Sequence, residues 1–329
     1  MTRKKDKKPW SIKKKVIVIL SSLLGIILFC LLGVAGYGYY AYNKVDTVEI
    51  NREEVLNDNG KKEEHKNITN IALFGVHSGE VDGGADGMYG LADSIMILTI
   101  NEDKKEIKIS SIMRDTYVNI PTYGDSIINQ AMQVGGPALM LKTINTSFDL
   151  DIDKFIGVNL NTLPQLIDKL GGLDMEVDAE EVPLVNGGVA DINKRDGTNS
   201  PGIKSSGKQH LNGTQVTSYC RIRHTEGNDF KRTERQRMVF TLIASKLSSM
   251  SVSNLNSFVL EELPIVQTNL TIGEIASIGK QILSVGTGNI QQNRFPNDGD
   301  HWSTLTVGDY RLNMNKEVTI EKMHEFIYN

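Results

Sequence analysis

The sequence predicts a single α/β domain with a central mixed sheet flanked by helices, placed outside the cytoplasm on an N-terminal transmembrane helix. Three observations support this prediction: an uncharged apolar run near the N-terminus, strand-like segments that alternate with helix-like ones, and the absence of an internal repeat. We divide the chain into a cytoplasmic basic tail (1–15), a transmembrane helix (16–36), a stalk (37–67) and the α/β domain (68–329).

The apolar run at residues 16–35 predicts the membrane span. Its twenty residues carry no charge and are long enough to cross ~30 Å of hydrocarbon. Eight basic residues and one acidic residue precede it, which places the N-terminus in the cytoplasm, and four tyrosines at 37–42 suit the outer interface. A cleaved signal peptide is the alternative, but the run is long for one and no Ala-x-Ala site follows. We therefore expect a single-pass protein of the cell membrane.

The charge of the outer part argues against nucleic acid as a partner. The whole chain has 36 basic and 40 acidic residues, and without the basic tail 28 and 39 remain, a net charge of −11. Binding to a phosphate backbone needs a net basic surface. Of the two cysteines, Cys30 lies in the predicted span and cannot pair with Cys220, so we expect no disulfide. The six histidines are scattered, without the spacing of a zinc site.

Apolar runs bounded by polar or Gly-rich segments predict the strands of the sheet. The first is ITNIALFGV (68–76), followed by a Gly-rich loop at 79–90. SIMILTI (94–100) and EIKISSIM (106–113) flank the polar turn NEDKK and predict a β-hairpin. Further strands are expected at KFIGVNL (154–160), LDMEVD (173–178) and TSYCRIRH (217–224).

Helical periodicity alternates with these strands. Pro137 suits the first turn of a helix whose Leu141, Ile144 and Phe148 share one face. Residues 185–207 show no hydrophobic pattern and predict a long exposed loop. The other helices are expected at 161–170, where Gly171 and Gly172 end the helix, near 213–218, and from about 231 to 250.

A basic cluster, RIRHTEGNDFKRTERQR at 221–237, is the strongest candidate for a binding site. In the predicted strand, Arg221 and Arg223 point to the same face. In the helix that follows, Arg232, Arg235 and Gln236 share a face with the apolar side chains of the next turns. A solvated basic face would place its arginines opposite that apolar stripe.

Two interpretations of this cluster remain open. Buried guanidinium groups need anionic partners, and Asp229 and Glu226 offer only partial neutralisation. An anionic ligand is one solution, since the planar guanidinium binds two phosphate oxygens at once. A structural network of salt bridges is the other.

Acidic residues at strand ends suggest a metal beside this cluster. Arg114 and Asp115 directly follow the strand 106–113, and Asp93 precedes the strand 94–100. A pyrophosphate site commonly includes a divalent cation bound by carboxylate oxygens.

These segments resemble the LytR–CpsA–Psr family. The likeness covers roughly residues 68–250 and rests on ADSIMILTIN, on ISSIMRDTYVNIP and, most specifically, on YCRIRHTEGNDFKRTERQR. It implies an α/β fold whose apolar cavity holds a polyprenyl tail, with an arginine-ringed, Mg²⁺-assisted mouth for the pyrophosphate. The implied activity is transfer of an anionic glycopolymer, of teichoic acid or capsule type, from a polyprenyl-pyrophosphate carrier to peptidoglycan.

The resemblance assigns roles to individual residues. Asp93 matches a retained acidic residue that is catalytic and binds the metal, and Arg114 matches a catalytic, pyrophosphate-binding arginine. His77 stands where the family usually has Asp; it is either a nitrogen ligand to the metal or a loop histidine without a chemical role. Asp82 and Asp86 in the Gly-rich loop are alternative sources of the missing carboxylate. The remaining pyrophosphate-binding positions are matched by Arg221, Arg223, Arg232, Arg235 and Gln236.

Three departures from the family pattern leave two functions open. His77, Leu91 and Ile127 stand where the family usually has Asp, Arg and Lys, so one metal ligand and two cationic groups are missing. The first function is an Mg²⁺-dependent phosphotransferase. The second is a catalytically weakened protein that binds lipid pyrophosphate and modulates polymer attachment. A role in transcription conflicts with the predicted topology, because the arginines lie outside the cell.

Overall fold

The computed structural model describes residues 46–57, 67–77, 90–223, 228–250, 254, 258, 266–286, 288, 290–306 and 309–329. The predicted transmembrane helix, the basic tail and nearly all of the Gly-rich loop 79–90 lie outside these residues. None of the helices within the described ranges is long and apolar enough to cross a membrane. Residues from Val45 to the C-terminus form one unit.

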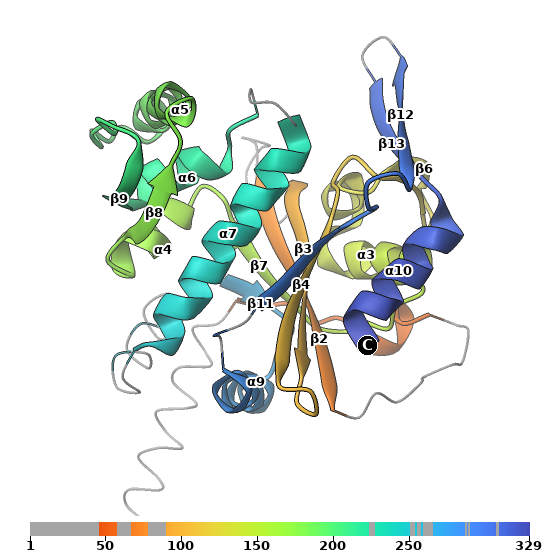
Figure 1. Cartoon of the computed structure of the whole chain (residues 1–329). Helices are drawn as coiled ribbons and strands as arrows, with labels where there is room; N and C mark the ends of the chain where they lie inside the picture. The colour runs from red at the N-terminus through yellow and green to blue at the C-terminus, as the bar shows by residue number, and fades with distance from the viewer. Residues whose placement is uncertain are drawn as a thin grey trace, which may run out of the picture. The chain divides into compact units, whose positions relative to one another are not determined.

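A mixed sheet of seven strands organises this unit and confirms the predicted α/β class (Figure 1). The hairpin predicted around NEDKK is confirmed, since its two strands pair antiparallel, and the first predicted strand pairs with the first arm of that hairpin. In spatial order the strands are β1 (Asp46–Thr47), β10 (Val266–Thr268), β7 (Phe155–Asn159), β2 (Ile68–His77), β3 (Leu91–Asn101), β4 (Glu106–Ile112) and β11 (Ile290–Phe295). Parallel pairs join β2 to β7, β4 to β11 and β1 to β10.

Helices α3 (Gln130–Phe148) and α10 (Lys316–Tyr328) cover one face of the sheet. The backbone of α3 is non-helical at Gly135 and Gly136, so that Pro137 begins the second helical segment, as its fixed φ favours. Leu141, Ile144 and Phe148 on the predicted face are each 0% exposed. They pack against alternate residues of the strands in the largest hydrophobic cluster, which we call the packed face.

The opposite face of the sheet packs against α7 (Asn228–Ser248) and α9 (Ile272–Val285), as Figure 1 shows for α7. Beyond α7 lies a second layer with a hydrophobic cluster of its own. Side chains of α7 contribute to both clusters, with Phe240 in one and Val239 in the other. The outer layer consists of α4 (Leu163–Lys169), β8 (Leu173–Val177), α5 (Glu181–Asp196), β9 (Gly207–Leu211) and α6 (Gly213–Cys220).

Two hairpins extend from the packed side of the sheet. The first is β5 (Tyr117–Ile120) with β6 (Gly124–Ile127), and the second is β12 (His301–Thr306) with β13 (Asp309–Met314). A parallel bridge between Thr116 and Leu312 ties the two hairpins together beside the end of β4. The C-terminal hairpin therefore borders the segment that carries Arg114.

The predicted loop at 185–207 is wrong over its first half, which is helix α5. The spacing of Val185, Val189 and Ile192 places one apolar stripe toward the outer layer's core, where each is at most 3% exposed. Gly187 and Gly188 made this stripe hard to recognise in the sequence. The helix ends where Gly197 adopts a left-handed conformation.

The predicted strand TSYCRIRH is also wrong. Asn212 and Gln215 form a capping box that begins helix α6, and the helix continues to Cys220. Val216, Tyr219 and Cys220 then lie on one buried helical stripe. Arg221 ends the helix, so the prediction that Arg221 and Arg223 share one face of a strand is wrong.

Part of the predicted stalk belongs to the domain. Strand β1 joins the sheet, and the short helix α2 (Arg52–Val55) buries Val55, which is 3% exposed, in the packed face. Arg52 forms a salt bridge with Glu274 at 2.7 Å. The partners of β1 and of Arg52 lie more than two hundred positions further along the chain, in β10 and at Glu274. The polar composition of 43–66 gave no sign of these contacts.

Candidate functional site

A β-bulge near the ends of β2 and β3 places Asp93 at the centre of the site. Gly75 pairs with Ser94 and Val76 pairs with Ala92, so Asp93 has no partner residue on β2. An extra residue of this kind re-aims its side chain out of the regular alternation. A Cβ atom on Gly75 would lie only 3.0 Å from the Cβ atom of Ser94, so the close approach at the bulge favours glycine.

Arg114 connects Asp93 to two further carboxylates. Its Nη1 atom donates to Oδ1 of Asp93 at 2.5 Å. Its Nη2 atom lies 3.4 Å from Oδ1 of Asp229, and its Nε atom lies 3.6 Å from Oδ1 of Asp115. Burial lowers the pKa of Arg114, but the three carboxylates outweigh that effect and the pKa is raised. The guanidinium is therefore charged and held in place.

Arg232 is almost completely buried in the same group. Its side chain is 2% exposed, with Nη2 at 2.9 Å from Oδ1 of Asp229 and Nη1 at 3.9 Å from Oδ1 of Asp93. Burial lowers its pKa to about 10, although Asp229 opposes the change. No acceptor within the described part of the chain bonds its Nε atom. A buried cation with an unfilled donor is costly to the fold and is typical of an anion-binding site.

Arg221 and Arg223 approach this group from the segment that follows α6. The Nη2 atom of Arg223 lies 3.8 Å from Oδ1 of Asp93, and its side chain is 50% exposed. Arg221 is exposed, and partial burial together with nearby Arg195 lowers its pKa. Their exposure leaves both guanidinium groups accessible to a ligand.

Arg235 and Gln236, which adjoin each other in α7, take different positions. Arg235 donates from Nε to Glu181 on α5 at 2.7 Å, with both side chains nearly buried, and its guanidinium lies over the ring of Tyr219. The structure therefore does not bring Arg235 to Asp93, and its geometry is that of a structural ion pair. Gln236 does reach the site, where its Nε2 atom lies 3.5 Å from the backbone carbonyl of Asp93.

His77 ends β2 opposite Leu91, beside the bulge. Burial and then the charge of Arg221 lower the pKa of His77, so its imidazole is neutral at neutral pH. Leu91 is 36% exposed, and Ile127 is half-buried where it pairs with Tyr117. The two positions where the family usually has cations thus carry apolar side chains.

An apolar cavity of about 290 Å³ adjoins the arginine group. It lies between the sheet and the outer layer, where the two hydrophobic clusters on this side do not meet. Arg221 and Gln236 belong to its wall, which connects the cavity to the Asp93 group. Most of the lining is aliphatic or aromatic, including Leu73, Phe74, Met96, Ile156, Val158, Leu160, Leu163, Leu166, Val239, Phe240, Ile243 and Leu247.

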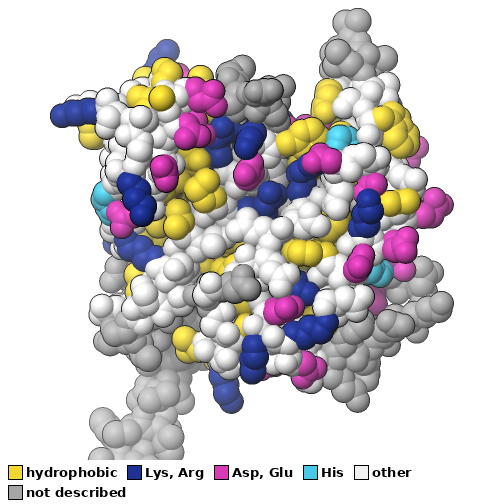
Figure 2. Space-filling model, in the orientation of Figure 1, with side chains coloured by type: hydrophobic (Ala, Val, Ile, Leu, Met, Phe, Trp, Pro, Cys, Tyr) yellow, Lys and Arg dark blue, Asp and Glu magenta, His cyan; other side chains and the backbone are white. Residues whose placement is uncertain are grey.

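The charges around Asp93 nearly balance, which bears on the predicted metal. Arg114, Arg223 and Arg232 lie among the carboxylates of Asp93, Asp115 and Asp229. Figure 2 shows basic and acidic side chains side by side near the N-terminal half of α7. Within the described ranges, no group of three or more acidic, histidine or cysteine side chains could hold a metal ion. These residues fit Mg²⁺ only when a ligand supplies further oxygens, with Asp93 as the protein's contribution.

Sequence reasoning gave too little weight to Asp115 and Asp229. Burial raises the pKa of Asp115, against the opposing charge of Arg114. Asp229 bridges Arg114 and Arg232 from the first turn of α7, where a helix stabilises negative charge. The Arg–Asp dipeptide and the acidic first turn were visible in the sequence, but their convergence depends on the fold.

Together, the fold and the site define an α/β protein in which an apolar cavity ends at a cluster of arginines. The model of the LytR_cpsA_psr family matches residues 37–324. The chain belongs to this family.

Relatives and solved structures agree with that assignment. The chain is 30% identical over 274 residues to the polyisoprenyl-teichoic acid–peptidoglycan teichoic acid transferase TagU of Bacillus licheniformis. The alignment covers 81% of each protein. The crystal structure of B. subtilis TagT aligns with a TM-score of 0.63 at 20% identity, over 85% of this chain and 99% of that one. TagT (YwtF) with bound octaprenyl pyrophosphate lipid aligns with a TM-score of 0.61 at 20% identity, over the same shares. At this identity the structures establish the fold alone.

Proposed function

We propose that this protein transfers an anionic glycopolymer, of teichoic acid or capsule type, from a polyprenyl-pyrophosphate carrier to peptidoglycan. The burial of Arg232 carries the proposal, because a guanidinium that is 2% exposed and has an unfilled donor suits an anionic ligand. Two similar proteins support the same donor and reaction: TagU is a teichoic acid transferase, and TagT has been solved with bound octaprenyl pyrophosphate.

The cavity and the arginines divide donor binding between them. The isoprenoid chain occupies the apolar cavity, where each buried CH₂ group contributes ~0.8 kcal/mol. The pyrophosphate then lies among Arg114, Arg223 and Arg232, with Arg221 at the cavity wall. Asp93 and Asp229 hold the arginines in place before the ligand binds, which lowers the cost of ordering them.

The reaction exchanges the phosphoanhydride bond of the pyrophosphate for a phosphoester bond to the acceptor. An acceptor hydroxyl oxygen attacks the phosphorus that carries the glycan, and the bond from that phosphorus to the bridging oxygen breaks. The hydroxyl proton is lost, and polyprenyl phosphate leaves. Arginines fixed around the phosphates stabilise the negative charge that develops, which is the main contribution a protein makes to phosphoryl transfer.

Mg²⁺ is part of this proposal. Asp93 would hold it together with phosphate oxygens of the donor, and His77 offers a neutral nitrogen close to the same carboxylate. The ion would supply positive charge to the pyrophosphate, in place of the cationic groups that Leu91 and Ile127 do not provide.

We also propose that the domain lies outside the cytoplasmic membrane on the helix expected at 16–36. The support comes from the uncharged run and from the eight basic residues before it. An isoprenoid donor and a peptidoglycan acceptor both suit that location.

One observation favours the alternative of a weakened, lipid-binding relative. Of the two carboxylates with which the family is expected to hold the metal, this chain retains only Asp93, because His77 replaces the other. The Oδ1 atom of Asp93 already accepts a hydrogen bond from Arg114. A protein of this kind binds lipid pyrophosphate yet transfers no polymer.

The test compares two variants of the full-length protein in detergent. Arg223→Ala removes a half-exposed cation that faces Asp93, and we expect affinity for octaprenyl pyrophosphate to fall about tenfold or more, since charge-assisted bonds contribute ~1.5–3 kcal/mol. Lys231→Ala is the control: this lysine is 54% exposed and pairs outward with Glu234, so affinity should not change. Equal affinities would contradict the arginine site. Wild-type binding without transfer of polymer to peptidoglycan, with Mg²⁺ present, would favour the alternative.

A further inference from the structure

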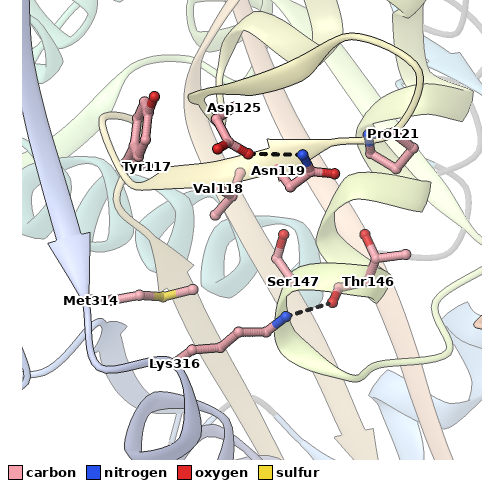
Figure 3. Close-up of a pocket in the computed structure, with 9 residues that line it drawn as sticks. All are labelled: Tyr117, Val118, Asn119, Pro121, Asp125, Thr146, Ser147, Met314 and Lys316. Atoms are coloured by element: carbon pink, nitrogen blue, oxygen red, sulfur yellow. Dashed lines mark hydrogen bonds between the residues drawn. The ribbon is translucent and has the colours of Figure 1, made fainter.

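A second pocket, of about 460 Å³, opens on the packed side of the sheet, away from the apolar cavity. Figure 3 shows the β5–β6 hairpin above it and the last turn of α3 below it, with the end of β13 and the start of α10 at one side. Its volume falls within the ~300–1,000 Å³ range of small-molecule sites. The arginine site uses none of its lining residues.

Polar groups from three separate segments converge on this pocket. Asn119 donates from Nδ2 to Oδ1 of Asp125 at 2.8 Å across the hairpin, which leaves the amide oxygen and the second carboxylate oxygen available. Ser147 is 5% exposed, and in Figure 3 its hydroxyl points into the pocket. Lys316 bonds the carbonyl of Thr146 at 3.4 Å, near the end of α3, and keeps two further protons for a ligand.

Apolar groups complete the walls. Val118, Pro121 and Met314 lie between the polar groups, and Tyr117 also borders the pocket. In Figure 3 the ring of Tyr117 points away from Ser147 and Lys316, and the guanidinium of Arg311 lies over that ring, 4.4 Å from its centroid. A wall that alternates apolar surface with paired amide, carboxylate and hydroxyl groups matches a sugar ring, which carries hydroxyls at its rim and C–H groups on its faces.

Other ligand classes fit this pocket less well. A phosphate or carboxylate would meet one lysine and the opposing charge of Asp125. A metal ion would meet a single carboxylate, and in the part of the chain that the structure describes no metal-binding group of three occurs. An isoprenoid would leave the amide, carboxylate and ammonium groups without polar partners.

The pocket lies close to the arginine site along the chain. Tyr117 follows Arg114 by three residues, so their Cα atoms are at most about 11 Å apart. The intervening Asp115 and Thr116 are tied to β13, the same strand that contributes Met314 to the pocket. One saccharide chain could therefore extend from the phosphates to the pocket.

We propose that this pocket is a saccharide-binding subsite that takes one hydroxyl-rich sugar ring. The proposal deepens the transferase function, because such a ring can belong to the peptidoglycan acceptor or to the glycopolymer donor. Binding of a free oligosaccharide needs neither lipid nor turnover, so the subsite can be tested separately from the proposed function.

The experiment titrates chitotetraose, an oligomer of N-acetylglucosamine, into full-length protein in detergent micelles and measures binding by calorimetry. Asn119→Ala with Asp125→Ala should weaken binding at least tenfold, and Lys316→Ala should weaken it about threefold. The matched control is Asn67→Ala with Asp103→Ala, which removes an exposed Asn–Asp pair of nearly the same length, 2.9 Å, from the far end of the sheet. The control should bind like the wild type.

Three results would overturn the subsite: no binding of chitotetraose by the wild type, equal weakening in both double variants, or binding of a peptidoglycan stem peptide in place of the sugar. Octaprenyl pyrophosphate affinity, measured on the same samples, should be unchanged in the pocket variants, which separates this test from that of the arginine site. In transfer assays, a raised KM for peptidoglycan identifies the acceptor as the source of the ring, and a raised KM for the donor identifies the glycopolymer. Either result supports the subsite.

Discussion

The two faces of the central sheet use alternate residues of the same strands, yet they are packed to different degrees. On the packed face, Ile97 and Phe155 are 0% exposed under α3 and α10. On the other face, Leu73 and Met96, which line the cavity, retain 6–7% exposure, whereas Ile71 and Ile109, away from the cavity, are 0% exposed. Since successive side chains of a strand point to opposite faces, one strand can stabilise the fold with half of its residues and line a ligand cavity with the other half.

The largest expected effect is on stability, from a truncation on the packed face. Phe155→Ala removes a fully buried ring that stacks on Phe74 at 6.0 Å, and we expect a loss of ~3–5 kcal/mol in the free energy of unfolding. Leu73→Ala, next to an existing cavity, should cost ~2 kcal/mol, at the low end of its class. Denaturation of both variants in urea measures the difference. Equal losses would show that the two faces are packed alike.

A filled cavity should affect binding much more than stability. Val158 lines the cavity from β7, and Val158→Phe places a ring in that space. We expect octaprenyl pyrophosphate to bind at least tenfold more weakly, with the free energy of unfolding within ~1.5 kcal/mol of the wild type. Val158→Ile, which adds one methylene, is the control and should bind nearly normally. Wild-type affinity in the phenylalanine variant would place the isoprenoid elsewhere.

The smallest expected effect is on the pH dependence of the free energy of unfolding, through His77 at the end of β2, beside the arginine site. Burial and Arg221, with smaller contributions from Arg195 and Arg223, lower the pKa of His77 in the folded protein, whereas Asp93 opposes them. The unfolded chain therefore binds this proton more readily than the folded protein does. The contribution of neutral His77 to the free energy of unfolding is fully present above the ordinary pKa of ~6.5 and is lost as pH falls below it. His77→Gln should flatten this part of the pH profile. An unchanged slope between pH 5 and 7 would assign the dependence to other groups.

Much of the central sheet could be predicted from the sequence because its signals are local. The apolar strands and the polar turn after Asn101 identify the hairpin, and Pro137 with its buried stripe identifies the second segment of α3. The prediction of a strand from Thr217 onward was wrong for a physical reason: Thr217 and Tyr219 suit a strand by propensity, but the capping box at Asn212 begins a helix that continues through them.

The site was only partly accessible to the same reasoning. The phasing predicted that Arg232 and Gln236 share the apolar side of α7, and the structure brings both to Asp93, a convergence that only the family resemblance had implied. Arg235 lies on the same predicted stripe but pairs with Glu181, a partner on a helix that the sequence pattern had concealed. The bulge at Asp93 depends on the register between β2 and β3, which hydrophobic alternation alone does not specify.

The cavity between two separately packed clusters has a thermodynamic consequence for the protein. Any molecule that occupies it in the folded state alone stabilises the fold by mass action, by ~2.7 kcal/mol when its free concentration is one hundred times its Kd. The melting temperature then rises with the free concentration of the molecule that the cavity takes. Under the proposed function that molecule is the lipid-linked donor, so the fold would be less stable where this donor is scarce.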